Sequence, residues 1–151
     1  MSRSEKAKQY FQSGYNCSQA VAIAFSDLIG MDEKAIARIV SGFGGGVGRM
    51  REVCGAVSGM TFVLSALYGY DDAKDYENKK RIYVEVQALA NKFKEENGSI
   101  VCRELLGLNT QGADSPAPEK RTEGYYKKRP CAELVEYSAA ILEDYIDNRT
   151  L

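Results

Sequence analysis

Helix start and stop signals recur along almost the whole chain and enclose apolar stripes of helical spacing. One helix is expected over residues 4–12. The next should begin after Asn16, a favourable N-cap with Gln19 as its capping-box partner, and end at Gly30. Because no strand pattern or internal repeat competes with these signals, the sequence predicts an all-α bundle of about six to seven helices. The remaining helices are expected over residues 32–40, 52–68, 71–96, 100–106 and 130–146.

Length and charge narrow the possible classes of protein. A chain of 151 residues is expected to form a single helical domain over residues 1–151, with residues 109–129 as a long loop. The net charge of −1 gives no indication of a nucleic-acid partner, and the basic residues at 120–121 and 127–129 are interpreted as a solvated loop. The uncharged run 53–70 is too short and too polar to predict a membrane span. Without a secretory signal, a cytoplasmic location is expected.

Four cysteines, Cys17, Cys54, Cys102 and Cys131, are widely separated and form no C-x-x-C pair. In a reducing cytoplasm structural disulfides are rare, so these residues are expected to be catalytic, metal-binding or simply buried. Each lies in the first turn of an expected helix. Free N–H groups and partial positive charge at a helix N-terminus favour a thiolate. We therefore predict that the four sulfurs meet at one site.

The helix ends alone do not activate a thiol. One N-terminus contributes about 0.3–1 kcal/mol, whereas a shift of one pKa unit requires about 1.4 kcal/mol. Arg49 and Arg51 flank Cys54 and could pair with its thiolate, which makes Cys54 the expected attacking residue, with Cys17 as its partner. Cys102 and Cys131 would then form a second pair. Alternatively, a metal ion or iron–sulfur cluster bound by all four cysteines would deprotonate them outright.

Glycines surround Cys54 and suggest a close approach. Gly44, Gly45 and Gly46 precede it, and Gly55 and Gly59 lie four residues apart, on one face of the expected helix. That face could admit a cofactor, or it could serve tight helix packing. The run lacks the spacing and the Lys-Ser/Thr pair of a phosphate-binding loop. The absence of histidine excludes a Cys–His nucleophile pair and a histidine-ligated metal.

The surroundings of the cysteines resemble a known family. In order they are GYNCSQAV, GGGVGRMREVCGAVSG, VCRELLG and RPCAELV. Together they are similar to the motifs of the C_GCAxxG_C_C family of bacterial and archaeal redox-active proteins, over about residues 14–146. The resemblance implies a redox role for the cysteines. Members tend to be encoded near transporter genes, and a similar domain occurs in split-Soret cytochromes, which implies a transporter or a redox protein as partner.

Three functions remain open on the sequence. The first is thiol–disulfide exchange, in which case the protein would be a thiol–disulfide oxidoreductase. In the second, a four-cysteine iron–sulfur cluster or metal ion makes the protein an electron carrier or sensor. In the third, the protein is a helical interaction module that docks a transporter. Apolar faces on so many helices also make a homodimer plausible.

Overall fold

The computed structural model describes residues 1–108 and 112–150. Within these ranges every regular element is a helix, and the only strand-like feature is an isolated β-bridge between Val53 and Val101. The predicted all-α fold is therefore confirmed. The helices are α1 (Arg3–Gln12), α2 (Cys17–Ile23), α3 (Ser26–Ile29), α4 (Glu33–Val40), α5 (Gly44–Val47), α6 (Gly55–Tyr68), α7 (Tyr76–Asn97), α8 (Cys102–Leu105), α9 (Glu123–Lys128) and α10 (Cys131–Asn148), with a 3-10 turn at Ser41–Phe43.

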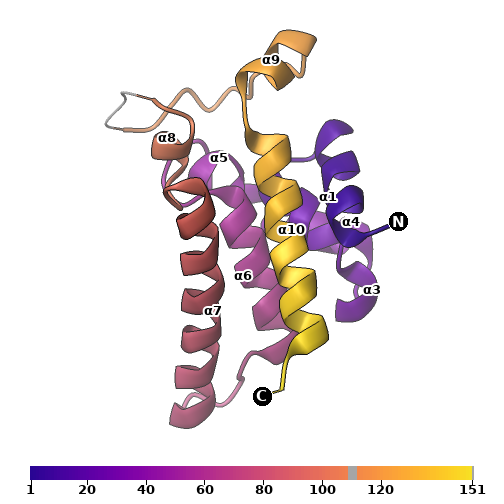
Figure 1. Ribbon diagram of the computed structural model, residues 1–151, viewed down its shortest axis with the longest axis vertical. Helices are drawn as coiled ribbons and strands as arrows, with labels where there is room; N and C mark the ends of the chain where they lie inside the picture. Colours follow the sequence, from indigo (N-terminus) through magenta and orange to yellow (C-terminus); the bar gives the residue numbers. More distant parts are fainter. Residues whose placement is uncertain (109–111, 151) are drawn as a thin grey trace.

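Three long helices, α6, α7 and α10, run side by side and pack on one another (Figure 1). The shorter N-terminal helices cover the other side, where α1 lies against α10 and α2 lies between α4 and α6. Fully buried side chains such as Phe11, Phe25, Leu64, Phe93 and Leu142 fill the space between these layers. None of the helices in the described ranges has the length and hydrophobicity that crossing a bilayer requires.

Most helix boundaries follow the capping signals of the sequence. The Asn16 side chain accepts a hydrogen bond from the backbone N–H of Gln19 at 3.0 Å, and the Gln19 side chain accepts one from Asn16 at 3.0 Å. The predicted capping box is therefore present. Asp32 caps α4, while Gly30 and Gly98 end α3 and α7 in the left-handed conformation.

Other boundaries differ from the prediction. The helix expected to end at Gly30 is interrupted at Ala24 and Phe25, which divide it into α2 and α3. The long helix begins at Tyr76 because the Asp75 side chain, rather than Asp71 or Asp72, caps it by accepting the Asn78 N–H. The predicted loop 109–129 contains α9, capped by Thr122. Residues 109–111 of that loop lie outside the described residues.

The central helix also starts later than predicted, and this shapes the site. Residues 52–54 are not helical: Val53 pairs with Val101 in the antiparallel bridge, the Cys54 N–H donates to the Ile100 carbonyl at 2.8 Å, and the Cys102 N–H donates to Glu52 at 2.6 Å. Cys54 is consequently the N-cap of α6. The same pairing makes α8 begin at Cys102 instead of residue 100. It also brings two cysteine-bearing segments together.

Candidate functional site

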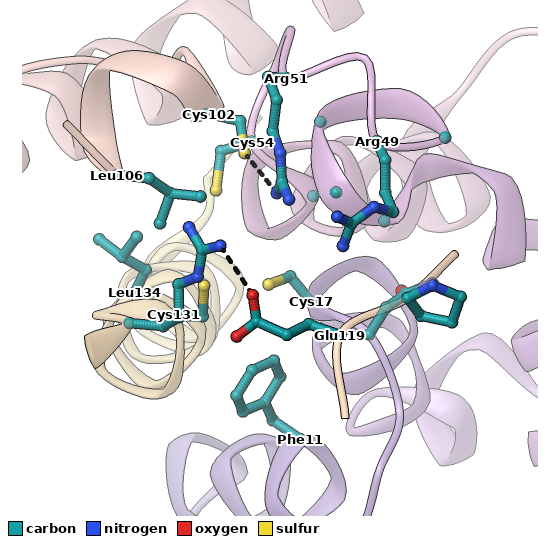
Figure 2. Close-up of a pocket in the computed structure, with 18 of the residues that line it drawn as sticks. Phe11, Cys17, Arg49, Arg51, Cys54, Cys102, Leu106, Glu119, Cys131 and Leu134 are labelled. Carbon is teal, nitrogen blue, oxygen red and sulfur yellow. Dashed lines mark hydrogen bonds and ion pairs between the residues drawn. The ribbon is translucent and has the colours of Figure 1, made fainter. Parts of the chain in front are cut away.

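Helix N-termini bring all four cysteines to one pocket with a volume of about 400 Å³ (Figure 2). Cys17, Cys102 and Cys131 are the first residues of α2, α8 and α10, and Cys54 immediately precedes α6. All four are free thiols; Cys54 and Cys102 are buried, and Cys17 and Cys131 are half-buried. Although the cysteines are distant in the chain, they therefore share one concave surface.

The glycine segment forms one wall of this pocket. Gly44, Gly45 and Gly46 all line it. Gly46 has a left-handed backbone (φ +69°), and a Cβ added there would lie 2.6 Å from the Cys102 Cβ and 2.7 Å from the Glu52 nitrogen. A Cβ at Gly44 would overlap the Asn16 side chain. The small residues thus let the segment lie directly against two cysteine-bearing helix ends, those of α2 and α8.

Gly55 and Gly59 serve mainly to pack α6 closely on α2. A Cβ at Gly59 would lie 2.8 Å from the Ser18 carbonyl oxygen and 3.0 Å from the Val21 Cβ, and Gly59 is not among the residues that line the pocket. Gly55 does line it, and its added Cβ would lie 3.1 Å from the Cys17 Cβ. The contacts at Gly59 match the helix-packing alternative left open by the sequence.

Arg49 and Arg51 line the pocket but do not serve Cys54 as expected. The buried Arg51 guanidinium donates from Nη1 to the Cys102 Sγ at 3.7 Å and from Nη2 to Asp114 at 3.0 Å. Arg49 also pairs with Asp114, at 3.4 Å, and donates to the Ser115 carbonyl. Both arginines therefore fix the segment that follows α8, and the bridge places Cys102, rather than Cys54, beside Arg51.

Burial dominates the electrostatics of Cys54 and Cys102. Burial raises the pKa of the Cys54 thiol to about 12, although the N–H groups of Ala56 and Val57 work against it. Burial also raises the pKa of Cys102, and the Arg51 guanidinium offsets only part of that effect. Both residues are therefore protonated near neutral pH.

Cys17 and Cys131 form a hydrogen-bonded pair with opposite shifts. A hydrogen bond from the Cys17 thiol lowers the pKa of Cys131, despite burial, and the positive charges of Arg129, Arg121 and Arg51 lower it further. The same hydrogen bond, together with burial, raises the pKa of Cys17 well above its ordinary range. Cys131 is also the first residue of an 18-residue helix, whose N-terminus favours a thiolate. Cys131 is therefore the more acidic thiol of the pair, and Cys17 the one that keeps its proton.

Sequence reasoning missed the basic residues around this pair. Arg121 donates to the backbone carbonyls of Phe11 at 2.7 Å and Tyr15 at 2.9 Å, and its guanidinium lies 4.2 Å from the centre of the Phe11 ring. Arg129 is 9% exposed and lies 3.4 Å from Glu119. The interpretation of these basic residues as solvated is wrong for both arginines. In the sequence, Arg129 stands two residues before Cys131 and Arg51 three residues before Cys54, so an arginine shortly before a cysteine could have indicated Arg129.

The side chains of the described residues also bear on the metal-centre alternative. Across the described ranges, no group of three or more cysteine, aspartate, glutamate or histidine side chains is arranged to hold a metal ion. The residues as arranged therefore do not fit a four-cysteine cluster.

The fold and the pocket define an all-α protein with four cysteines gathered at helix N-termini. The chain belongs to the C_GCAxxG_C_C family, described as "Putative redox-active protein (C_GCAxxG_C_C)", which matches residues 15–145. The resemblance seen in the sequence is thereby confirmed. Comparisons with curated proteins and with solved structures gave no significant match.

Proposed function

We propose that the protein performs thiol–disulfide exchange, with Cys131 as the attacking thiolate and Cys17 as the resolving thiol. The supporting observation is the hydrogen bond that lowers the pKa of Cys131 and keeps Cys17 protonated. A thiolate is the reactive form in disulfide exchange, and an attacking thiol needs a neighbour to complete the reaction. The opposite pKa shifts of Cys131 and Cys17 support these two roles, and both residues are more accessible than Cys54 and Cys102.

The exchange is balanced in two steps. The Cys131 thiolate attacks one sulfur of a substrate disulfide, forms a mixed disulfide and releases the other half as a thiolate. Cys17 then loses its proton and attacks Cys131, so that a Cys17–Cys131 disulfide forms and the second half leaves as a thiol. The substrate gains two electrons and the protein loses two. An external dithiol of the reducing cytoplasm, small or carried by a partner protein, returns the pair to its reduced form.

The proposal differs from the sequence-based choice of Cys54 as attacker. Cys54 is 4% exposed, and its raised pKa leaves very little thiolate at neutral pH. Cys102 is also buried, and its contact with Arg51 does not overcome the effect of burial. In the proposed cycle these two cysteines stay reduced and form the inner wall of the pocket.

The test is disulfide mapping of the reduced protein after treatment with hydroxyethyl disulfide. We expect loss of two of the four thiols and a single Cys17–Cys131 link. Cys17→Ser should instead accumulate a mixed disulfide at Cys131, and Cys131→Ser should lose the reaction. Cys54→Ser should still form the link. A disulfide between Cys54 and Cys102, with Cys17 and Cys131 still reduced, would overturn the assignment.

Anaerobic purification separates the proposal from the cluster alternative. The dithiol site predicts a colourless protein with four titratable thiols. Brown protein with stoichiometric iron, lost on substitution of any one cysteine, would replace thiol exchange by electron transfer through a cluster.

A further inference from the structure

The pocket carries more positive than negative charge. Among the described residues that line it are four arginines, Arg49, Arg51, Arg121 and Arg129, and a single carboxylate, that of Glu119. Asp114, just outside the lining, pairs with both Arg49 and Arg51. Two carboxylates therefore face four guanidinium groups, and even a Cys131 thiolate leaves the pocket positive.

Arg121 is the least neutralised of these cations. In the part of the chain that the structure describes, no carboxylate lies within ion-pair distance of it, and its hydrogen bonds go to two backbone carbonyls and the Tyr126 hydroxyl. Its guanidinium lies over Phe11 and Tyr125, at 4.2 and 5.0 Å from the ring centres. Neutral groups thus fix its position without cancelling its charge, which leaves it suited to an anionic ligand.

Arg129 already holds a carboxylate from the chain itself. Its Nη2 lies 3.4 Å from Glu119 Oε1, and Figure 2 shows the Glu119 side chain reaching into the pocket on the side of Cys17 and Cys131. Glu119 is 35% exposed and belongs to a segment without helical structure, between Pro118 and Lys120. A ligand carboxylate could therefore replace it at Arg129 without disturbing the helices.

The rest of the wall indicates the shape of the ligand. Leu105, Leu106, Leu134 and Phe11 line the same pocket. Apolar side chains favour methylene groups over a compact inorganic oxyanion. A volume of about 400 Å³ suits a small molecule, and the partial burial of Cys131 disfavours attack on a disulfide held within a folded protein.

We propose that the substrate is a small aliphatic disulfide that carries carboxylates, one of which displaces Glu119 and binds Arg129 and Arg121. This inference rests on the proposed thiol–disulfide exchange. The Cys131 thiolate attacks the nearer substrate sulfur, the departing half leaves as a thiolate carboxylate, and Cys17 resolves the mixed disulfide. The substrate disulfide is reduced to two thiols as the protein dithiol is oxidised.

The first experiment compares three disulfides of similar length on the reduced protein: dithiodipropionate, which is anionic, hydroxyethyl disulfide, which is neutral, and cystamine, which is cationic. Rate constants for formation of the Cys17–Cys131 link should fall in that order, and the anionic preference should shrink as salt is added. Equal rates, or a preference for cystamine, would overturn the inference and leave thiol exchange standing. No reaction with any of the three would overturn the exchange itself.

Charge variants then test the residues. Arg129 also lowers the pKa of Cys131, so its loss changes the reactivity of Cys131 towards every disulfide. The readout is therefore the ratio of the rate constant for dithiodipropionate to that for hydroxyethyl disulfide, in which this common change cancels. Arg129→Gln and Arg121→Gln should each lower this ratio roughly tenfold, as for a lost charged hydrogen bond. Glu119→Gln should raise it by removing the internal competitor. Arg38→Gln, an exposed arginine on α4, is the control and should leave it unchanged.

An unreactive analogue checks binding separately. Suberate has the length and charges of dithiodipropionate but no disulfide. It should slow the reaction of hydroxyethyl disulfide with the wild-type protein and with Arg38→Gln, and have little effect on Arg129→Gln. The absence of inhibition in the wild type would overturn the carboxylate site.

Discussion

At the residue scale, the four cysteines share a helix-end position but differ in their partners. Each begins or immediately precedes a helix, so the helix end alone does not explain why only Cys131 has a lowered pKa. The pKa of Cys131 is lowered by the Cys17 thiol and by the arginines around it. At Cys54, burial is the largest cause, and it raises the pKa. The helix-end position is common to all four cysteines, and the neighbouring thiol and arginines distinguish Cys131, the proposed nucleophile.

The first prediction concerns alkylation. Since the pKa of Cys131 is lowered, iodoacetamide should label it at a pH where Cys17, Cys54 and Cys102 are still protected. The pH midpoint of Cys131 labelling should rise in Cys17→Ala, which removes the hydrogen bond. Peptide mass spectrometry over a pH series measures both midpoints. The prediction fails if Cys131 labels with the midpoint of an ordinary thiol, or if Cys17→Ala leaves it unchanged.

The second prediction concerns Cys54 and alkaline stability. Its pKa is raised from 9.0 to about 12 in the folded state, so between these values the folded chain binds the proton more tightly than the unfolded chain. The stabilisation is complete below pH 9 and is lost as the pH rises towards 12. The limiting slope is about −1.4 kcal/mol per pH unit.

Urea unfolding under reducing conditions at several values above pH 8 measures this slope. Cys54→Ala should be less stable than the wild type at pH 8, and the difference should narrow as the pH rises. Tyrosines with raised pKa values, such as Tyr145, contribute equally to both proteins and cancel in the comparison. A constant difference between the two proteins across the series would contradict the shift at Cys54.

At the element scale, local signals predicted the helices well and the contacts between them poorly. The Asn16 capping box and the Gly98 stop depend on neighbours in the sequence, so the sequence reveals them. The non-helical residues before Cys54 depend on pairing with Val101, about 48 residues away, which no local pattern encodes. For the same reason the sequence predicted Arg51 beside Cys54, whereas the bridge places it beside Cys102.

The third prediction tests the glycine wall through Gly46→Ala. The added methyl group would meet the Cys102 Cβ and the Glu52 backbone, and the left-handed backbone is unfavourable for alanine. We expect a loss of at least about 2 kcal/mol in the free energy of unfolding. Cys102 should also become easier to alkylate, because the segment over it must shift. Urea denaturation and mass spectrometry measure the two effects.

A control lies four residues away in the same segment. Gly42 has no positive φ, and a Cβ there meets nothing within 4 Å. Gly42→Ala should therefore change the free energy of unfolding by less than about 1 kcal/mol and leave Cys102 protected. Equal losses in the two variants would mean that the segment tolerates no substitution, rather than that Gly46 is fitted to Cys102.

At the scale of the whole molecule, the starts of α6 and α10 and the short helix α8 lie towards one end of the bundle, and the C-terminus lies towards the other (Figure 1). The cysteine pocket is built at the first of these ends, whereas a buried charged cluster joins α7 to the C-terminal end of α10. Glu85 on α7 is 1% exposed and accepts hydrogen bonds from Arg81, Arg149 and Tyr145, each at 2.6 Å. Burial raises the pKa of Glu85, but the hydrogen bonds from Arg149 and Tyr145 outweigh it and the net shift is downward. This cluster ties the C-terminal end of α10 to α7.

The sequence anticipated the cysteines of the pocket but not its full composition. Their position after helix caps was visible, yet Arg121 reaches Phe11 across 110 residues and Arg49 reaches Ser115 across 66. Such contacts depend on how the C-terminal part of the chain folds back over α1 and the glycine segment. The pairing of Cys17 with Cys131 has the same origin, because α10 returns to the start of α2.

The last prediction separates stability from thiol chemistry through Glu85→Gln. This variant keeps the shape of the side chain but removes the negative charge between two arginines, so we expect a loss of about 3 kcal/mol in the free energy of unfolding. Since the folded-state pKa of Glu85 is lowered, its stabilisation is present above the unfolded pKa and is lost as the pH falls through the folded value. The cost of the variant should therefore shrink in acid, whereas exposed Glu95→Gln should cost little at any pH. Urea unfolding at pH 7 and pH 4 tests both expectations.

Because the cluster lies far along α10 from Cys131, the folded Glu85→Gln protein should form the Cys17–Cys131 disulfide at the wild-type rate. A slower reaction under conditions in which the variant is fully folded would mean that the charged cluster controls the geometry of the pocket as well as the stability of the bundle.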